Sequence, residues 1–502
     1  MINYITKPKS IKSTEFDKQR SSLCPKDYRK LYNSNQNVKP LSSLINNHFQ
    51  GHEIGSEAYV KKSKYRFLKT ANISNEFLID ENSIEYCHPI GLQNPEYGNI
   101  LIVKDGGESG LGEVCYYNLD NTELLDGISA GILAINVIDE YKFYVLGLLK
   151  SQHFKDFINL KTPEGSTIRH SKKVALEYLL SFPSSKNEAN NKEIITFVGL
   201  IVQNIIHKEE EIKRKNKLID TLISTELEKN QKENNYNFSL PKISMIKANQ
   251  NRLDSGTYGK EFKKIELLIN NYKFGSTNIL KNHTASRGQN LQVTNIGQSF
   301  YSDYPKKNFY QLITNVEIND ARCISKFRYL GSQKKLMLIP ENTILLTADG
   351  TVGRCIFVKD LKNTITNIHP WLIVRKQMLG KNIMEDVFIA LFLGWLRSAN
   401  SFYEKIKDKA NGGGIKHNHL ANYLNYPNFQ EEKQHEIAQE YYNPQPKNTE
   451  LSLDNYLEEE EKRNKILGIS QLNMEIFTLK EVLNEVVDSI ITNQFVQVSL
   501  EY

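Results

Sequence analysis

The chain has 502 residues, of which 39% are hydrophobic and 24% are charged, and its 64 Lys and Arg against 58 Asp and Glu give a formal net charge of +6. This length allows two to four domains, and this composition argues against a disordered chain. No apolar run reaches the roughly 18 residues that a membrane helix needs, so we expect no membrane span.

The N-terminal sequence Met1–Lys7 lacks the basic stretch and apolar core of a secretory signal. The cysteines are few, odd in number and widely spaced, which argues against a disulfide framework and against a zinc site. They are Cys24, Cys87, Cys115, Cys323 and Cys355. We therefore expect a cytoplasmic protein without bound metal. The small positive charge permits nucleic-acid binding but does not establish it.

Short segments recur in the same order about 240 residues apart, which predicts a duplicated domain. The matches pair 43–51 with 267–275, 68–73 with 291–296, 98–106 with 341–350, 165–170 with 413–417, and 182–183 with 426–427. A period of this length far exceeds that of solenoid repeats.

Each copy has the signals of a mixed α+β domain. Apolar strand signals at 100–103 and 344–346 end in Asp-Gly, which indicates a tight turn, and 355–358 supplies a returning strand. The apolar runs 143–149 and 387–393 predict buried helices. In the turns we expect Asp105 and Asp349 to bond their own backbone. The accompanying turn glycines are Gly106, Gly350 and Gly353.

A long helix is predicted after each copy. Residues 188–229 carry a heptad seam with polar interruptions, and its members are Ile195, Val198, Val202, Ile205, Glu209, Ile212, Asn216, Ile219 and Ile223. The second seam is wholly apolar and comprises Ile469, Leu472, Ile476, Leu479, Leu483, Val486 and Ile490. Charged residues such as 208–215 are expected at exposed positions. Each seam has to be buried, and the simplest partner is the other helix, so we expect an intramolecular coiled coil.

This organisation resembles the DNA-specificity (S) subunits of Type I restriction-modification systems. Residues 252–258 (RLDSGTY) are similar to the start of a recognition domain in that family, and 349–353 (DGTVG) to its Asp-Gly-x-x-Gly turn. Residues 428–438 resemble the start of its helix. The resemblance implies two target-recognition domains, 1–187 and 241–450. It also implies a central helix with linker, 188–240, and a C-terminal helix, 451–502, which pair antiparallel.

The resemblance further implies a non-catalytic subunit that binds double-stranded DNA. Each recognition domain would read one half of a bipartite site, and the helices would set the gap between halves. Two adenine methyltransferase (M) subunits would dock on the helices, and restriction (R) subunits would add translocation and cleavage. No cofactor is implied for this chain, because S-adenosylmethionine and ATP with magnesium belong to the partner subunits.

Candidate DNA contacts are basic residues in both copies. They are Lys61, Lys62, Lys64, Arg66 and Lys69 in the first copy, with Lys281, His283 and Arg287 as counterparts in the second. Lys and Arg bind phosphates, and Arg also binds guanine in a bidentate manner. A solvated loop is the alternative for each of these residues.

A basic residue followed by His recurs after a Gly-containing loop, as Arg169-His170 and as Lys416-His417. A feature shared by both copies suits folding or docking, and DNA contact is the alternative. Trp371 follows His369-Pro370 and either stacks on an extruded base or fills the core. The strand-like run after it favours the core.

Two other functions remain open at this point. A stand-alone DNA-modifying enzyme would need its own site, yet the sequence has no Pro-Pro pair, no Gly-x-x-x-x-Gly-Lys-Ser/Thr loop and no His-Glu-x-x-His motif. We therefore expect no catalytic residues. A structural adaptor with two protein-binding domains would suit the duplication and the heptads equally well.

Overall fold

The computed structural model describes residues 4–13, 28–89, 91–107, 109–119, 123–163, 165–184, 190–233, 238–248, 258–399, 402–406, 413–447 and 450–500. The chain forms two units. Unit 1 comprises 1–210, 446–465 and 474–502, and unit 2 comprises 211–445 and 466–473. The family-like segment 252–257 lies outside the described residues. Within the described ranges, no helix combines the length and the hydropathy needed to cross a membrane.

Unit 1 contains an antiparallel four-stranded sheet, which we call sheet 1A. Its order is β10 (Val114–Tyr116), β8 (Ile100–Val103), β12 (Ile132–Val137) and β4 (Ile45–Gln50). All four residues of β8 are buried, which explains its unbroken apolar sequence. The strand predicted at 100–103 is therefore confirmed.

A second sheet of unit 1, sheet 1B, has the order β11 (Leu125–Ile128), β6 (Tyr65–Leu68), β7 (Glu85–Cys87) and β5 (Tyr59–Val60). β11 runs parallel to β6, whereas the other neighbours are antiparallel. Leu68 and Ile128 of this sheet share a buried cluster with Leu101 and Ala134 of sheet 1A. This cluster is the core that joins the two sheets.

Unit 2 repeats this topology strand for strand. Sheet 2A has the order β21 (Cys355–Val358), β20 (Thr343–Thr347), β23 (Pro370–Arg375) and β16 (His283–Arg287). Sheet 2B has the order β22 (Thr364–Thr366), β18 (Tyr310–Ile313), β19 (Arg328–Ser332) and β17 (Ser299–Ser302). Again the first pair of sheet 2B, β22 with β18, is parallel. The duplicated domain is thereby confirmed in its topology.

A small antiparallel pair also occurs in each unit and fixes the alignment of the copies. In unit 1 the pair consists of β14 (Leu179–Ser181) and β3 (Val38–Pro40). In unit 2 it consists of β24 (Asn425–Pro427) and β15 (Ser276–Asn278). The match of 98–106 with 341–350 is correct, because β8 corresponds to β20. The match of 182–183 with 426–427 is two residues out of register, because Ser181 takes the place of Pro427.

Two of the sequence matches are wrong. β4, within 43–51, corresponds to β16 and not to 267–275, which lies before β15. Residues 68–73 begin at the last residue of β6, which corresponds to β18, whereas 291–296 precedes β17. Both matches paired short sequence segments that belong to different elements. Short segments of this kind, rich in apolar residues, occur in many strands and helices, so their similarity does not show correspondence.

Equivalent glycines follow β4 and β16. A Cβ on Gly51 would lie 1.9 Å from the carbonyl oxygen of Ile128, and a Cβ on Gly288 would lie 2.1 Å from that of Asn367. In both units the chain passes against the backbone at the end of the corresponding strand of the second sheet, which is β11 in unit 1 and β22 in unit 2. Only glycine fits these two positions.

Two helices pack beside the first sheet in each unit. They are α2 (Lys142–Leu149) and α3 (Gln152–Lys161) in unit 1, and α9 (Ile383–Ser398) and α10 (Phe402–Ile406) in unit 2. All residues from Tyr144 to Leu149 and from Val387 to Leu393 are buried. The buried helices predicted from these apolar runs are confirmed.

The structure also describes shorter strands and α-helices outside these sheets. They are β1 (Ile5–Thr6), β2 (Lys30–Leu31), β9 (Asp105–Gly106), β13 (Arg169–His170), α5 (Ile243–Ala248), α6 (Lys260–Asn270), α7 (Ile279–Asn282), α8 (Val293–Ile296), α11 (His417–Tyr423) and α12 (Glu431–Gln439).

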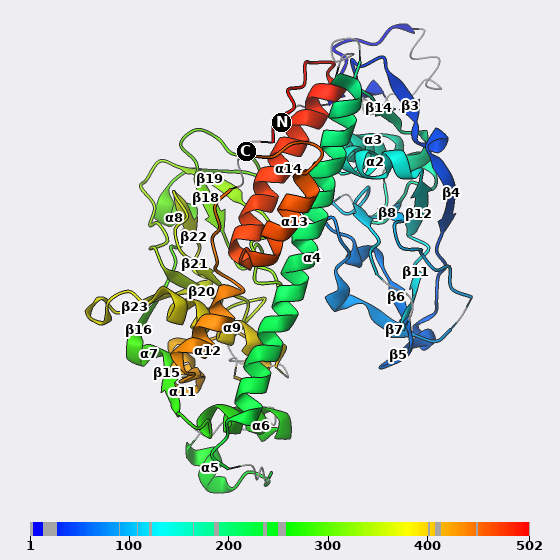
Figure 1. The fold of residues 1–502 in the computed structure, drawn as a ribbon. Helices are drawn as coiled ribbons and strands as arrows, with labels where there is room; N and C mark the ends of the chain where they lie inside the picture. Colours follow the sequence, from blue (N-terminus) through cyan, green and yellow to red (C-terminus); the bar gives the residue numbers. More distant parts are fainter. Residues whose placement is uncertain are drawn as a thin grey trace. The chain divides into compact units, whose positions relative to one another are not determined.

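The long helices are α4 (Asn191–Lys229) and α14 (Ile469–Ile491), preceded by the shorter α13 (Tyr456–Ile466). In unit 1, α14 lies antiparallel to α4 (Figure 1). Glu209 of α4 lies 3.5 Å from Lys480 of α14, while the Asn35 amide donates both to Phe182, before the start of α4, and to Ile490, near the end of α14. The expected antiparallel pairing is confirmed, and the seam of α14 is buried throughout.

The C-terminal helix is split, contrary to the expectation of one helix over 451–502. The N–H groups of Ile469 and Ser470, which open α14, donate to the carbonyls of Glu440 and Tyr441, just after α12. α12 thus ends where α14 begins, and residues 442–468 are inserted between them. A Cβ on Gly468 would lie 2.4 Å from the Tyr441 carbonyl oxygen, so this close approach requires glycine.

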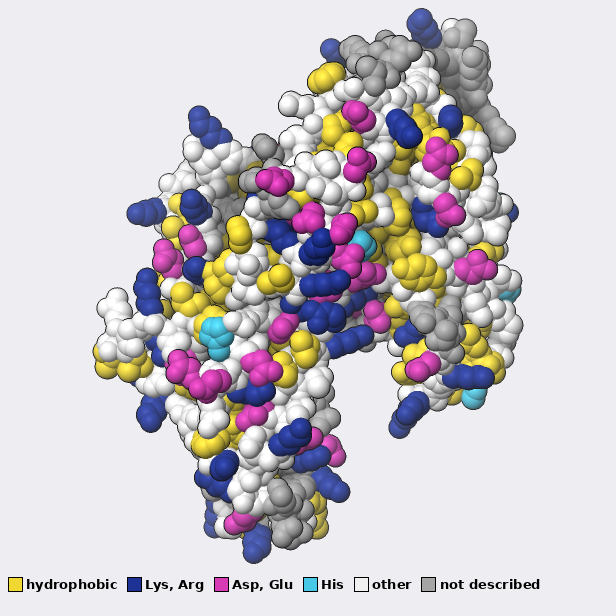
Figure 2. Space-filling view, viewed as in Figure 1, with side chains coloured by type: hydrophobic (Ala, Val, Ile, Leu, Met, Phe, Trp, Pro, Cys, Tyr) yellow, Lys and Arg dark blue, Asp and Glu magenta, His cyan; other side chains and the backbone are white. Residues whose placement is uncertain are grey.

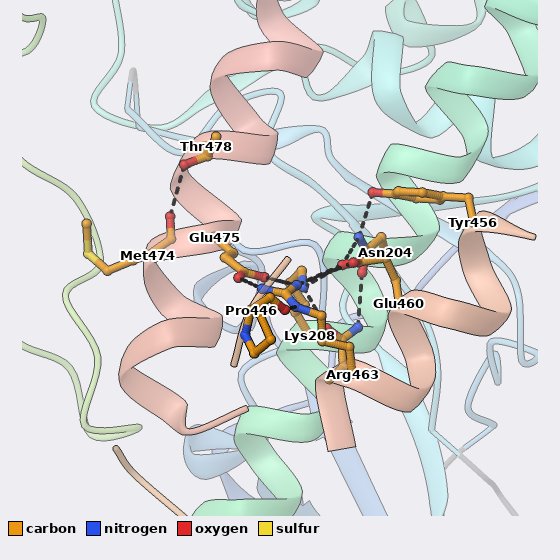
Figure 3. A network of polar contacts seen from close by, with 10 residues as sticks. Asn204, Lys208, Pro446, Tyr456, Glu460, Arg463, Met474, Glu475 and Thr478 are labelled. Carbon is orange, nitrogen blue, oxygen red and sulfur yellow. Dashed lines mark hydrogen bonds and ion pairs between the residues drawn. The ribbon is translucent and has the colours of Figure 1, made fainter. Parts of the chain in front are cut away.

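The inserted helix α13 covers a polar stretch of α4 within unit 1 (Figure 3). Lys208 Nζ binds Glu460 at 3.1 Å, Asn464 at 2.5 Å and Glu475 at 2.7 Å. Arg463 joins Glu460 and Glu475 from the other side. Although burial alone would raise it, the pKa of Glu475 is held below its ordinary value by Arg463 and Lys208. The expectation that 208–215 is an exposed charged run is therefore wrong at Lys208.

Candidate nucleic-acid interface

Three of the predicted contacts form a lysine loop between β5 and β6 of unit 1. Lys61, Lys62 and Lys64 are exposed. The Lys64 ammonium lies 5.2 Å from the centre of the Tyr65 ring, at the first residue of β6. Figure 2 shows Lys and Arg side chains at the end of unit 1 that carries β5 and β7. Exposed ammonium groups on a short loop suit phosphate contacts.

Arg66, the next basic residue, has a structural role instead. Its guanidinium binds Asp126 with two hydrogen bonds of 2.6 and 2.8 Å, and the Asp126 side chain is 0% exposed. Asp126 also accepts from the Tyr117 hydroxyl at 2.9 Å. The pair joins the parallel strands β6 and β11, so the edge of the guanidinium formed by Nε and Nη2 is committed to the fold.

Lys69 is likewise held by its own unit. Its ammonium binds Glu85 at 2.6 Å and lies 4.3 Å from the centre of the Tyr59 ring. The hydrogen bond to Glu85 raises the pKa of Lys69 above its ordinary value, although partial burial opposes it. The Lys69 ammonium thus covers the Tyr59 ring and is already paired with Glu85. The ammonium groups of the lysine loop are more exposed and suit a DNA contact better.

The counterpart of the lysine loop in unit 2 lies between β17 and β18, because β5 corresponds to β17 and β6 to β18. This loop carries Lys306 and Lys307, both exposed. The Lys306 ammonium lies 5.6 Å from the centre of the Phe309 ring, just before β18, as Lys64 lies against Tyr65. Sequence reasoning missed both lysines. The signal that could have found them is a pair of adjacent lysines between two segments that contain aromatic residues and are predicted to be strands.

The residues expected to be the counterparts lie elsewhere. Lys281 is exposed on α7, whereas the side chain of His283 is 0% exposed and binds Asp386 at 2.9 Å. Asp386 also binds Arg375 at 2.7 Å. His283 thus belongs to a buried polar group beneath β16, and a contact between His283 and DNA is excluded in this structure.

Arg287 lies flat on Trp371, with its guanidinium carbon 4.0 Å from the ring centre. It donates to the carbonyls of His369 and Ile415 at 2.5 and 3.0 Å. Trp371 is 6% exposed, and its indole N–H also donates to Ile415 at 2.9 Å. Burial lowers the pKa of Arg287, and Asp349 opposes this shift. The core position favoured for Trp371 is confirmed.

The two turn aspartates bind side chains, in contrast to the expected bonds with their own backbone. Asp105 lies 2.6 Å from Lys104 and 3.1 Å from His170. Asp349 lies 3.3 Å from His369 and 3.4 Å from Arg287. Gly350 and Gly353 have φ angles of 69° and 92°, as the predicted turn requires, whereas Gly106 is part of β9. Each aspartate therefore anchors a histidine near the surface.

The recurring basic-His steps are not equivalent in structure. Ser171 and Ile415 each donate a backbone N–H at 2.8 Å to corresponding carbonyls, those of Lys104 and Ala348, so the two steps are three residues out of register. Arg169 is buried and donates to Asn159, Thr162 and Pro163. The remaining members, His170, Lys416 and His417, are exposed.

No family model and no curated protein matches the sequence. Solved structures similar to the chain include the Type I restriction-modification S subunit from M. genitalium, at 11% identity and a TM-score of 0.37, over 93% of this chain and 99% of that chain. The HsdS subunit from Thermoanaerobacter tengcongensis is similar at 10% identity and a TM-score of 0.26, over 93% and 99%.

A third structure, titled for complex assembly and conformational transition of the type I R-M system, is similar at 11% identity and a TM-score of 0.27, over 93% of this chain and 100% of that chain. Each of these three structures is similar to this chain over 93% of its length.

Proposed function

We propose that the chain is a DNA-specificity subunit of a Type I restriction-modification complex, and that each unit binds one half of a bipartite site. The observation that carries the proposal is the recurrence of an exposed lysine loop at the same topological position of a duplicated fold. Lys61, Lys62 and Lys64 follow β5, and Lys306 and Lys307 follow the corresponding strand β17. Two copies of one domain, each with its own cationic loop, suit a DNA site with two halves.

The proposed division of labour places the chemistry on other subunits. Methyltransferase subunits would bind S-adenosylmethionine and methylate adenine, and restriction subunits would use ATP and magnesium. This chain would select the DNA and bind the methyltransferase subunits along its helices. The sequence motifs at 349–353 and 428–438 support the same family assignment, and the second of them opens α12.

Methylome sequencing of the host with and without this gene tests the proposal. The expected result is the loss of one bipartite adenine-methylated motif when the gene is deleted. Restoring the gene should restore the motif. An unchanged methylome in a strain that expresses the complex would overturn the proposal.

Binding measurements separate a DNA reader from a protein-binding adaptor. The affinity of the assembled complex for a duplex that carries the motif should fall steeply between 50 and 200 mM salt, because bound lysines release counterions from DNA. An adaptor without DNA contacts would show no salt-dependent binding to the duplex.

A further inference from the structure

The outer edge of sheet 2B exposes aromatic side chains. β17 is the last strand of the order β22-β18-β19-β17, and Phe300 and Tyr301 within it are 57% and 51% exposed. Exposed edge strands usually carry charges that block association, so an aromatic edge indicates a contact surface. Phe300 and Tyr301 point to opposite faces of the sheet, because successive strand residues alternate.

Phe300 lies on the face away from the core. Tyr301 pairs with Leu330, a fully buried member of the core cluster, whereas Phe300 pairs with Gly331. A Cβ on Gly331 would lie 2.5 Å from the Phe309 ring, so this ring covers the glycine on the same face as Phe300. Lys306 lies over Phe309. Gly331 thus allows a flat aromatic surface beside the lysine loop.

The two ends of β17 are basic. Residues 303–309 follow the strand with Lys306 and Lys307, and residues 326–335 run alongside it with four further basic residues, which are Lys326, Arg328, Lys334 and Lys335. The single acidic residue in 299–309 and 326–335 is Asp303, whose carboxylate lies 4.0 Å from Arg328. Six basic groups and one acidic group around a strand with two exposed aromatic side chains favour an anionic partner that also has apolar groups.

The corresponding strand of unit 1 lacks this surface. β5 has only two residues, Tyr59 and Val60, and both are half-buried. Tyr59 is covered by Lys69 and packs against Phe67 at 6.2 Å between ring centres. The aromatic edge is therefore a property of unit 2, although both units carry the lysine loop.

We propose that Phe300 is a specificity-determining residue of unit 2 that contacts the 5-methyl group of a thymine in the major groove of double-stranded DNA. The inference rests on the proposed function. The major groove, about 12 Å wide, admits a two-stranded β-ribbon, and a phenylalanine there contacts the thymine methyl. The basic residues at the two ends of β17 bind phosphates on either side of the groove.

Replacement of single thymines by deoxyuridine removes that methyl group and tests the contact. The assembled complex is titrated with duplexes of its methylated motif in which each thymine is replaced in turn. We expect one replacement, in one half-site, to weaken wild-type binding about threefold to tenfold. Phe300→Ser should weaken binding to the thymine duplex by a similar factor and be insensitive to that replacement, while Phe300→Leu should retain most of the sensitivity.

Matched controls separate the possible outcomes. Met378→Ser changes another exposed apolar side chain of unit 2, 86% exposed, and should bind like wild type. Urea unfolding of each variant reports its fold. The inference is wrong if Phe300→Ser remains sensitive to deoxyuridine, or if wild type shows no sensitivity to it. In either case the proposed function stands as long as the wild-type complex still shows salt-dependent binding to the motif. Loss of all motif binding by the wild-type complex overturns the proposed function itself.

Discussion

Lys208 and Glu475, 267 positions apart in the sequence, form an ion pair of 2.7 Å in which the Lys208 side chain is only 1% exposed. The same ammonium binds Glu460 and Asn464, so one cation holds α13 and α14 against α4 in unit 1. Figure 2 shows acidic and basic side chains mixed on the surface around these helices.

Lys208→Met should destabilise unit 1 by about 3–5 kcal/mol, because it leaves Glu460 and Glu475 buried with one cation fewer. Urea unfolding followed by circular dichroism measures the change. Lys462→Met is the matched control, since Lys462 is 59% exposed and binds Glu458 and Glu459 of its own helix. Equal stability of the two variants would show that the ion pair has no net structural role.

Gly51→Ala and Gly288→Ala should each destabilise their unit by about 2 kcal/mol or more, because the added methyl group overlaps a backbone carbonyl that cannot rotate away. Thermal unfolding of the single variants measures the effect. Gly110→Ala serves as the control, since a Cβ there meets nothing within 4 Å. Wild-type stability of either variant would contradict the close backbone approach at that glycine.

Unit 1 should lose stability between pH 6.5 and 4 through His153. Burial lowers the pKa of His153 to about 4, and its ring nitrogens lie 2.7 Å from the Tyr178 hydroxyl and 3.1 Å from the Tyr32 carbonyl. Above pH 6.5 the imidazole is neutral in both states. As the pH falls, the unfolded state takes up a proton that the folded state does not, so the free energy of unfolding decreases.

The full effect of this shift is about 3 kcal/mol at pH 4. Urea unfolding across this pH range should show a smaller pH dependence for His153→Gln than for wild type. His52→Gln, at an exposed position, is the control and should retain the wild-type dependence. An unaltered pH dependence in His153→Gln would mean that other groups cause the decrease.

Replacing the lysine loops by alanine should weaken DNA binding with little effect on folding. The triple variant Lys61→Ala, Lys62→Ala, Lys64→Ala should reduce the slope of log K against log salt by about 1 for each phosphate that the loop no longer binds. The double variant Lys306→Ala, Lys307→Ala should do the same for unit 2. Lys462→Ala with Lys465→Ala on α13 should leave the slope unchanged, and an equal decrease in all three variants would remove the special role of the loops.

The sequence was sufficient to predict the duplication, the buried strands and the pairing of the long helices. Apolar runs such as Ile100–Val103 and the seam of α14 carry their own periodicity, so their burial followed directly. The residue-by-residue alignment of the two copies was harder to predict from the sequence. β4 and β16 occupy the same place in their sheets, yet their sequences, INNHFQ and HTASR, share no pattern.

The candidate site was predicted in part, because charge alone does not show whether a basic side chain is already paired. Arg66 and His283 have acidic partners 60 and 103 positions away in the sequence, and only the folded chain reveals them. Lys61 and Lys62 were predicted because three of the four residues in 61–64 are lysines, which is visible in the sequence without knowledge of the fold. Lys306 and Lys307 were missed because their equivalence to that loop depends on strand order.

The division of unit 1 into distant segments has a consequence during synthesis on the ribosome. Residues 446–465 and 474–502 complete unit 1, yet they are translated after nearly all of unit 2. Until they emerge, Lys208 and the apolar positions of α4 that α13 and α14 cover remain without their final neighbours. The domain that is made first is therefore finished last, and a nascent chain paused near residue 445 would offer its uncovered helix to chaperones.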